Sequence, residues 1–324
     1  MKNTIVTNQQ KVDVIESIFG KGNLTNDGEN ISVSCPVCKS NSKNSSNKKK
    51  LAISTGSGIY HCWVCETKGR NIGYLVKKHM SFRKEDLSKL YDLFNFQEKD
   101  KKEDDEVILN LPHDYKLLVY ETNSYAKIAI KYLLSRGLTR DDFVKFKIGI
   151  SDEFEYSNRV IFPSHSENMN LNFYLSRVFD ESTFRKYKNC DAKRKNIIFN
   201  EYLIDWNKPV VLVEGIFDAI KAGDNSIPIL GSWLDENYYL FQKLVVNNTD
   251  VIMAFDPDAK DKEMKVAEML SEYGNKVYIL PNYSKDLGDM SKKEVNSLLE
   301  KKKLYEQSDR MTYLIQSIKS GSMF

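Results

Sequence analysis

The sequence contains no long apolar run: no stretch approaches the roughly eighteen consecutive apolar residues that a membrane-spanning helix needs. Its first residues, MKNTIVTNQQ, have no apolar segment of the kind that secretory signals carry. Because both the apolar run and the signal are missing, we expect a cytoplasmic protein without membrane contacts. A loop of the form G-x4-G-K-S/T is absent as well, which excludes ATP hydrolysis of the P-loop type.

Neither sign of charge is in large excess. The 48 Lys and Arg against 45 Asp and Glu give a net charge of +3, which excludes a histone-like polycation. Contact with nucleic acid must therefore come from local clustering of basic residues. Residues 1–80 form one such cluster, with twelve basic and five acidic side chains.

The 324 residues, of which 41% are hydrophobic, are enough for two or three domains. QEKDKKEDDE, residues 97–106, contains no apolar residue and predicts a linker after a small domain formed by residues 1–96. Beyond the linker, we expect a basic α+β segment at residues 107–207. Alternating strands and helices follow at 208–300, and a helical tail at 301–324 ends the chain.

Four short apolar runs carry the alternation: Val210–Val213, Ile227–Leu230, Val251–Phe255 and Lys276–Leu280. Strands that alternate with helices predict a parallel sheet with helices on its faces, so the fold class is α/β, or α+β over the whole chain. Thr139 and Ser291 stand where helix N-caps are expected.

Cysteine is scarce, yet four of the five cysteines form two C-x2-C pairs: Cys35, Cys38, Cys62 and Cys65. Four thiolates on two tight turns predict a closed, structural zinc site in a reducing compartment. His61 is a neighbouring alternative ligand. Cys190 stands alone and is interpreted as a structural or incidental thiol.

Aromatic and basic residues surround the second cysteine pair. Tyr60 and Trp63 either stack on unpaired bases or cover the metal site, and both interpretations stay open. The cations nearby are Lys48, Lys49, Lys50, Lys68 and Arg70. The polar stretch Ser40–Lys50 is either a solvated loop or a basic finger that touches phosphate.

Carboxylates follow three of the predicted strands. Glu214 follows the first run, Asp256 and Asp258 follow the third, and Asp286 lies beyond the fourth. Asp218 is one helical turn after Glu214. Because the carboxyl ends of parallel strands meet at one edge, these oxygens predict a site for Mg²⁺ or Mn²⁺. The alternative is that each acid caps a helix.

Several segments resemble DnaG-type primases. The acidic segments EGIFDAI, AFDPDAKDKEM and KDLGDM look like the Toprim domain, and YHCWVC resembles the primase zinc knuckle. YLLSRGLTRDDFVKFKIGI, NRVIFPS and SRVFDESTFRKYKN look like the basic half of the primase core. Bacterial members usually have a histidine among the zinc ligands. The four cysteines here are similar to those of some bacteriophage primases, and the chain looks most like the stand-alone primases of T-even bacteriophages.

The resemblance implies a zinc ribbon, a basic α+β subdomain and a Toprim parallel sheet. It implies a DNA primase, a nucleotidyltransferase that makes short RNA primers on single-stranded DNA and works with a replicative helicase in the bacterial host cytoplasm. One structural Zn²⁺ and catalytic Mg²⁺ or Mn²⁺ are the implied cofactors. The metal-binding and catalytic residues implied are Glu214, Asp256, Asp258 and Asp286, supported by Asp218. The template and the ribonucleoside triphosphates are expected to contact Arg159, Arg177, Lys186 and Lys188.

Four points stay open. Glu214 either binds metal or acts as the base for the attacking hydroxyl, and Asp289 is or is not a ligand. The chain as a whole could instead be another Toprim enzyme, a nuclease or topoisomerase. It could also be a non-catalytic zinc-ribbon module that binds a replisome.

Overall fold

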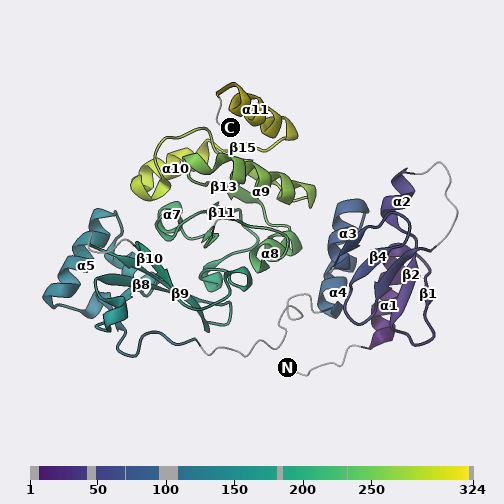
Figure 1. Ribbon diagram of the computed structural model, residues 1–324, viewed down its shortest axis with the longest axis horizontal. Coiled ribbons are helices and arrows are strands. Elements are labelled where there is room, and N and C mark those ends of the chain that lie inside the picture. Colours follow the sequence, from purple (N-terminus) through teal and green to yellow (C-terminus); the bar gives the residue numbers. More distant parts are fainter. Residues whose placement is uncertain are drawn as a thin grey trace. The chain divides into compact units, whose positions relative to one another are not determined.

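The computed structural model describes residues 7–41, 49–69, 71–94, 109–180, 185–231 and 233–320. The chain divides into two compact units, residues 1–105 and residues 106–324, each built on sheets of its own (Figure 1). The predicted linker at 97–106 lies outside the described residues, as do residues 42–48 of the polar stretch between the cysteine pairs. None of the helices in the described segments is long and apolar enough to span a bilayer.

The N-terminal unit contains a five-stranded antiparallel sheet with the order β1-β2-β3-β4-β5. Its strands are β1 (Asn23–Leu24), β2 (Asn30–Val33), β3 (Leu51–Ser54), β4 (Tyr60–Cys62) and β5 (Lys68–Gly69). Alternate side chains are buried, namely Ile31 and Val33 of β2 and Leu51 and Ile53 of β3. This alternation is typical of a sheet with one covered face. The accompanying helices are α1 (Asn8–Phe19), α2 (Pro36–Asn41), α3 (Ile72–His79) and α4 (Lys84–Phe94).

The C-terminal unit begins with an antiparallel sheet in the order β10-β9-β8-β7-β6. Its strands are β6 (Lys116–Leu117), β7 (Gly149–Ile150), β8 (Arg159–His165), β9 (Leu171–Val178) and β10 (Tyr187–Asn189). The accompanying helices are α5 (Ser124–Ser135) and α6 (Arg140–Lys145). Thr139 caps α6 as predicted, because its hydroxyl accepts a hydrogen bond from the Asp142 amide and the Asp142 carboxylate accepts one in return.

The second sheet of this unit has the order β12-β11-β13-β14-β15. Its parallel strands are β11 (Val210–Val213), β12 (Ser226–Pro228), β13 (Val251–Met253) and β14 (Val277–Ile279). The four predicted runs are thereby confirmed as a parallel sheet, and the α/β fold class with them. β15 (Lys303–Leu304) pairs antiparallel with β14. The start of the predicted C-terminal tail therefore belongs to the sheet.

Helices flank this sheet: α7 (Ile216–Ala222), α8 (Tyr239–Asn247), α9 (Lys260–Glu272), α10 (Lys292–Glu300) and α11 (Gln307–Ser320). Ser291 caps α10 through a capping box with Glu294, as predicted. α11 packs against α9, beyond β15 (Figure 1).

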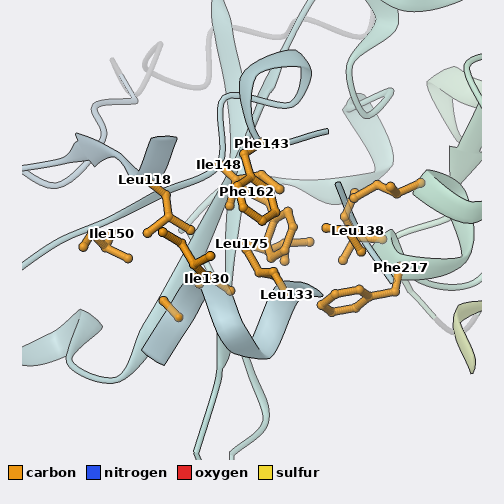
Figure 2. Packing of buried hydrophobic residues seen from close by; sticks show 14 of the residues in the cluster. Leu118, Ile130, Leu133, Leu138, Phe143, Ile148, Ile150, Phe162, Leu175 and Phe217 are labelled. Atoms are coloured by element: carbon orange, nitrogen blue, oxygen red, sulfur yellow. The ribbon is translucent and has the colours of Figure 1, made fainter. Parts of the chain in front are cut away.

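A hydrophobic core packs α7 against α5 and the antiparallel sheet of the C-terminal unit (Figure 2). Phe217 and Ile220 of α7 pack in the same cluster as Leu133 of α5 and Phe162 of β8. The opposite side of α7 contributes Ala219 to a second cluster with the parallel strands. Because α7 contributes to both clusters, it packs against the antiparallel sheet and the parallel sheet at once. The predicted domain boundary at residue 207 stays a prediction.

Candidate zinc centre and acidic strand-end site

The four paired cysteines come together in the N-terminal unit. Cys35 and Cys38 lie at the start of α2, Cys62 ends β4, and Cys65 follows in the adjoining turn. All four Sγ atoms lie within 4.8 Å of one another, with 3.8 Å between Cys35 and Cys65 and 3.6 Å between Cys38 and Cys62. Zn–S bonds of about 2.3 Å place tetrahedral neighbours about 3.8 Å apart. The thiols therefore fit a closed four-thiolate zinc site, as predicted.

The thiols also show why this cluster favours a cation. Burial raises the pKa of Cys35 to about 11 and also raises the pKa of Cys38. Burial opposes ionisation of Cys65 too, but hydrogen bonding with Thr67 lowers its pKa to about 6. Four neighbouring thiolates are stable together only when a bound metal ion offsets their charge.

The aromatic residues beside the knuckle take different positions. Tyr60 is buried, whereas the Trp63 side chain is 68% exposed. The His61 ring packs edge-on against Trp63 with 4.3 Å between ring centroids, and its Nε2 lies 3.1 Å from the Glu66 carboxylate. His61 thus supports Trp63 and stands outside the cysteine quartet. The buried Tyr60 fits the interpretation that the ring covers the metal site. The exposed Trp63 fits the interpretation that the ring stacks on an unpaired base.

The acidic residues gather where the strand order of the parallel sheet reverses. From β11 the chain passes through α7 to β12 on one side, and it returns through α8 to β13 on the other side. Glu214 directly follows β11, and Asp256 stands three residues beyond β13. Open α/β sheets bind ligands in the crevice at such a reversal.

Asp256 lies at the centre of these acids. Burial raises its pKa to about 7, and the charges of Asp218, Asp286, Glu214 and Asp258 add to the rise in that order. The five acids predicted from sequence therefore act on one another electrostatically. Like charges held this close favour a bound cation.

Asp218, Asp256 and Asp286 each lie at the start of a helix or a 3-10 turn. Of these three, only Asp218 makes the kind of hydrogen bond that the helix-cap alternative expects. Asp256 and Asp286 each precede a 3-10 turn, and neither side chain makes a capping hydrogen bond. Asp218 accepts hydrogen bonds from the backbone amides of Gly215 at 3.0 Å and Gly288 at 2.6 Å. It thereby ties the loop after β11 to the loop that contains Asp286.

Gly288 is required by this close approach. A Cβ at this position would lie 2.9 Å from Asp218 Oδ1 and 3.2 Å from Phe217 Cβ. The neighbouring Asp289 forms an ion pair with Arg136 of α5, with 2.9 Å between Nη1 and Oδ1. Arg136 also lies over the Phe217 ring, 4.9 Å from its centroid. The sequence did not single out Arg136.

Lys262 is a second residue that sequence reasoning missed. Its Nζ lies 2.8 Å from Glu214 Oε1, and its side chain is largely buried. It also stands over the Phe255 ring, 5.1 Å from the centroid. The lysine offsets part of the negative charge at this end of the sheet and fixes the Glu214 carboxylate.

The carboxylates at the strand ends fit a divalent cation that prefers oxygen ligands. Their oxygens are more widely spaced than the thiols of the cysteine quartet. Among the described residues, the cysteine quartet is the only set of three or more candidate ligands whose donor atoms all lie within 4.8 Å of one another. Mg²⁺ is usually held by one or two carboxylates, and water and substrate phosphates complete the shell. Asp256 with Asp258, aided by Asp286 or Glu214, can provide such a set.

The predicted basic residues lie on β8, β9 and β10 or just before them. Arg159 is 6% exposed, and its guanidinium donates hydrogen bonds to the carbonyls of Arg185 and Lys186. The side chain is thus held against the backbone of this loop, and the phosphate contact predicted for Arg159 stays a prediction.

The other three predicted cations differ in their availability. Lys186 is exposed. Lys188 is paired with Glu155 at 2.7 Å. Arg177 donates through Nε to Tyr132 Oη at 3.2 Å.

Tyr187 connects the basic strands to the acids. The Arg177 guanidinium lies 4.5 Å from the centroid of its ring. Burial raises the pKa of Tyr187, while the nearby Arg177 charge lowers it and the Asp218 charge raises it. Tyr187 therefore lies against Arg177 of β9, close enough to Asp218 for that charge to act on its phenol.

Comparisons with known proteins agree with these features. The Zn_ribbon_DnaG family model, described as CHC2 zinc finger, matches residues 1–106. The chain is 25% identical to the DNA primase of Thermotoga maritima over an alignment of 373 positions, which covers 98% of this chain and 63% of that protein. It is 23% identical to the DNA primase of Helicobacter pylori, with 84% of this chain and 56% of that protein covered. The chain thus spans less than two thirds of the length of these curated relatives.

Solved structures are similar at lower identity. The zinc-binding and RNA polymerase domains of Aquifex aeolicus primase align with a TM-score of 0.48 and 18% identity, over 92% of this chain and 85% of that one. The E. coli primase catalytic core aligns with a TM-score of 0.48 and 16% identity, over 60% of this chain and 78% of that one.

Proposed function

We propose that this chain is a DNA primase of the DnaG type, a DNA-dependent RNA polymerase that makes short RNA primers on single-stranded DNA. The observation that carries the proposal is the meeting of Asp256 with four other carboxylates at the strand-order reversal of a parallel sheet. The four-thiolate site on the same chain and the similarity to DNA primases support it. The Toprim assignment, the T-even bacteriophage type and a replicative helicase as partner are parts of this proposal.

The acids act as a group. Asp256 and Asp258 hold Mg²⁺ or Mn²⁺, with Asp286 assisting, and Glu214 either joins them or accepts the proton of the attacking 3′-hydroxyl. The bound cation offsets the charge of the triphosphate and lowers the pKa of the attacking hydroxyl. Asp218 keeps the two acidic loops at a fixed spacing through its hydrogen bonds to Gly215 and Gly288.

The basic strands supply the phosphate contacts. Arg177 lies on β9 and Lys186 directly precedes β10, whose first residue, Tyr187, pairs with Arg177 across the two strands. We assign these two cations to the template backbone or to the triphosphate. Lys188 contributes only when it leaves Glu155, which makes its contribution smaller.

One incubation tests the proposal directly. The protein is mixed with single-stranded DNA, labelled ribonucleoside triphosphates and Mg²⁺, and both the RNA and the DNA are sized. The proposal expects short RNA products and intact DNA. Shortened or topologically altered DNA without RNA would identify a nuclease or topoisomerase instead, and bound but unchanged DNA without product would identify a binding module.

Trp63→Ala is expected to weaken single-stranded DNA binding about tenfold. The exposed indole is fixed by His61, and its backbone amide donates to the Lys50 carbonyl at 3.1 Å, which keeps a cation-bearing residue beside it. Stacking of one base on an aromatic ring is worth about 1–3 kcal/mol. Fluorescence anisotropy of a labelled oligonucleotide measures the effect. Val64→Ala, which shortens the exposed apolar residue next to Trp63, is the matched control and should bind normally. Equal binding by Trp63→Ala and the control would reject the stacking interpretation.

Lys186→Ala and Arg177→Ala are each expected to weaken DNA binding and to flatten its salt dependence. Each contact with a single-stranded phosphate contributes a slope of about −0.7 to log K against log salt. Binding isotherms at several salt concentrations give the slope. Lys116→Ala is the control, since β6 lies at the opposite edge of the same sheet and Lys116 pairs with Asp152. A slope that stays the same in both variants would assign these cations to a solvated edge.

A further inference from the structure

A cleft of about 590 Å³ opens beside two of the acids, at the carboxyl ends of β13 and β14. Asp256 and Asp258 line one part of it. Phe255, Leu280 and Tyr283 line it from the segments at these strand ends, and Tyr313 lines it from α11. Neither the sequence nor the similarity to primases indicates a ligand site on α11.

Within the described segments, the charged residues that line the cleft form ion pairs, except Asp256 and Asp258. Lys260 forms an ion pair with Glu263, and Lys303 forms one with Asp309. In the part of the chain that the structure describes, no ion pair is found for Asp256 or Asp258. The cleft therefore combines an apolar, aromatic lining with uncompensated negative charge in one region.

The α11 wall is fixed in position. Arg310 forms an ion pair with Glu268 of α9, and the Tyr305 amide donates to the Val277 carbonyl of β14 at 2.8 Å. The Lys303–Asp309 pair connects β15 to the first turn of the helix. Tyr313 is thus presented to the cleft by an anchored element.

The dimensions and lining fit a flat heterocycle that carries phosphates. Sites for compounds of this size usually have volumes of about 300–1,000 Å³. About half of the residues that line this cleft are apolar or aromatic, and the rest are polar or charged. Thr312 adds a hydroxyl among the lining residues. Phosphates reach the acidic part through the divalent cation proposed for Asp256 and Asp258, while the apolar lining accepts the base.

We propose that this cleft binds the base and ribose of a nucleotide whose phosphates lie at the acidic site, and that Tyr313 of α11 stacks on the base. The inference rests on the proposed function, in which nucleoside triphosphates are the substrates. It goes further by assigning the nucleoside to α11 and the β13 and β14 loops.

Calorimetric titration of the full chain with ATP and with GTP, in the presence of Mg²⁺, tests this site. Tyr313→Ala is expected to weaken nucleotide binding about tenfold, because the stacking surface is lost. Tyr313→Phe keeps the ring and should bind nearly as well as the unmodified chain. Met311→Ala is the matched control, since Met311 lies on the same helix, is exposed and does not line the cleft.

Inorganic tripolyphosphate separates the base site from the phosphate site. It should bind equally to all four proteins, because it occupies only the acidic part. The proposal is overturned if Tyr313→Ala binds nucleotides normally, if it loses tripolyphosphate binding to the same extent, or if the unmodified chain binds neither nucleotide. Tyr313-dependent nucleotide binding without RNA synthesis would reject the proposed function alone.

Discussion

Replacing Asp256 by asparagine is expected to lower primer synthesis at least about 100-fold, which corresponds to about 3 kcal/mol of lost transition-state stabilisation. Asp256 is the carboxylate on which the other four acids act, so it is the one whose charge a bound cation most directly offsets. Asparagine keeps the shape of the side chain and removes that charge. Without the cation, the negative charge of the triphosphate is uncompensated and the attacking hydroxyl is not activated.

The fold of the Asp256→Asn variant should persist, because the substitution removes a charge that its neighbours repel and no capping hydrogen bond is lost. Primer yield is measured across a Mg²⁺ titration, with circular dichroism as the folding control. Asp261→Asn is the matched control, since Asp261 lies on nearby α9 and pairs with Lys265 at the surface. Near-normal yield from Asp256→Asn at ordinary Mg²⁺ would contradict the metal assignment.

The position of the acids could be predicted because it follows from backbone topology. Val210–Val213 and Val251–Met253 are buried on both faces, and such uninterrupted apolar runs are typical of central parallel strands. Once these strands are parallel neighbours, the residues that follow them must meet at one edge. The strand order and the meeting of Glu214 with Asp256 therefore needed no side-chain detail.

The partners of the acids could not be predicted, because they depend on how helices are rotated against the sheet. α9 begins with Lys260 and Lys262, and only the structure shows that Lys260 pairs with Glu263 and Lys262 with Glu214. Arg136 likewise comes from α5, which is distant in sequence from Asp289. The alternating charges in the sequence of α9 do not indicate which of its side chains face the acids at the strand ends.

Arg159 shows the opposite limit of sequence reasoning. A basic residue at the start of a strand next to a basic segment is a reasonable phosphate ligand, and its type and position gave no sign of burial. Its side chain is held by the carbonyls of Arg185 and Lys186, which come within its reach only when the chain folds back along β9. Similarly, Gly288 has its place because Asp218 approaches its amide closely, a contact between residues 70 positions apart.

Removal of zinc is expected to unfold residues 30–70 and to abolish template-directed initiation. The strands here are two to four residues long, and residues 30–70 supply few buried apolar side chains, chiefly Ile31, Val33, Leu51 and Ile53, so this segment depends on the metal for its fold. Structural zinc contributes about 10–16 kcal/mol to the folding of small zinc fingers, as much as the whole stability of an ordinary domain. Hydrogen exchange of the backbone amides, with and without a chelator, should show lost protection within residues 30–70.

The two compact units allow a sharp control for zinc removal. The acids and the α11 cleft lie in residues 106–324, so the zinc-free protein should still bind ATP while it fails to start primers. Cys38→Ser should lose the metal, because it removes one of four thiolates. Cys190→Ser should keep one zinc per chain, since Cys190 lies outside the quartet and accepts a hydrogen bond from the Tyr174 amide. Initiation at normal sites by metal-free protein would show that the ribbon does not need zinc to engage the template.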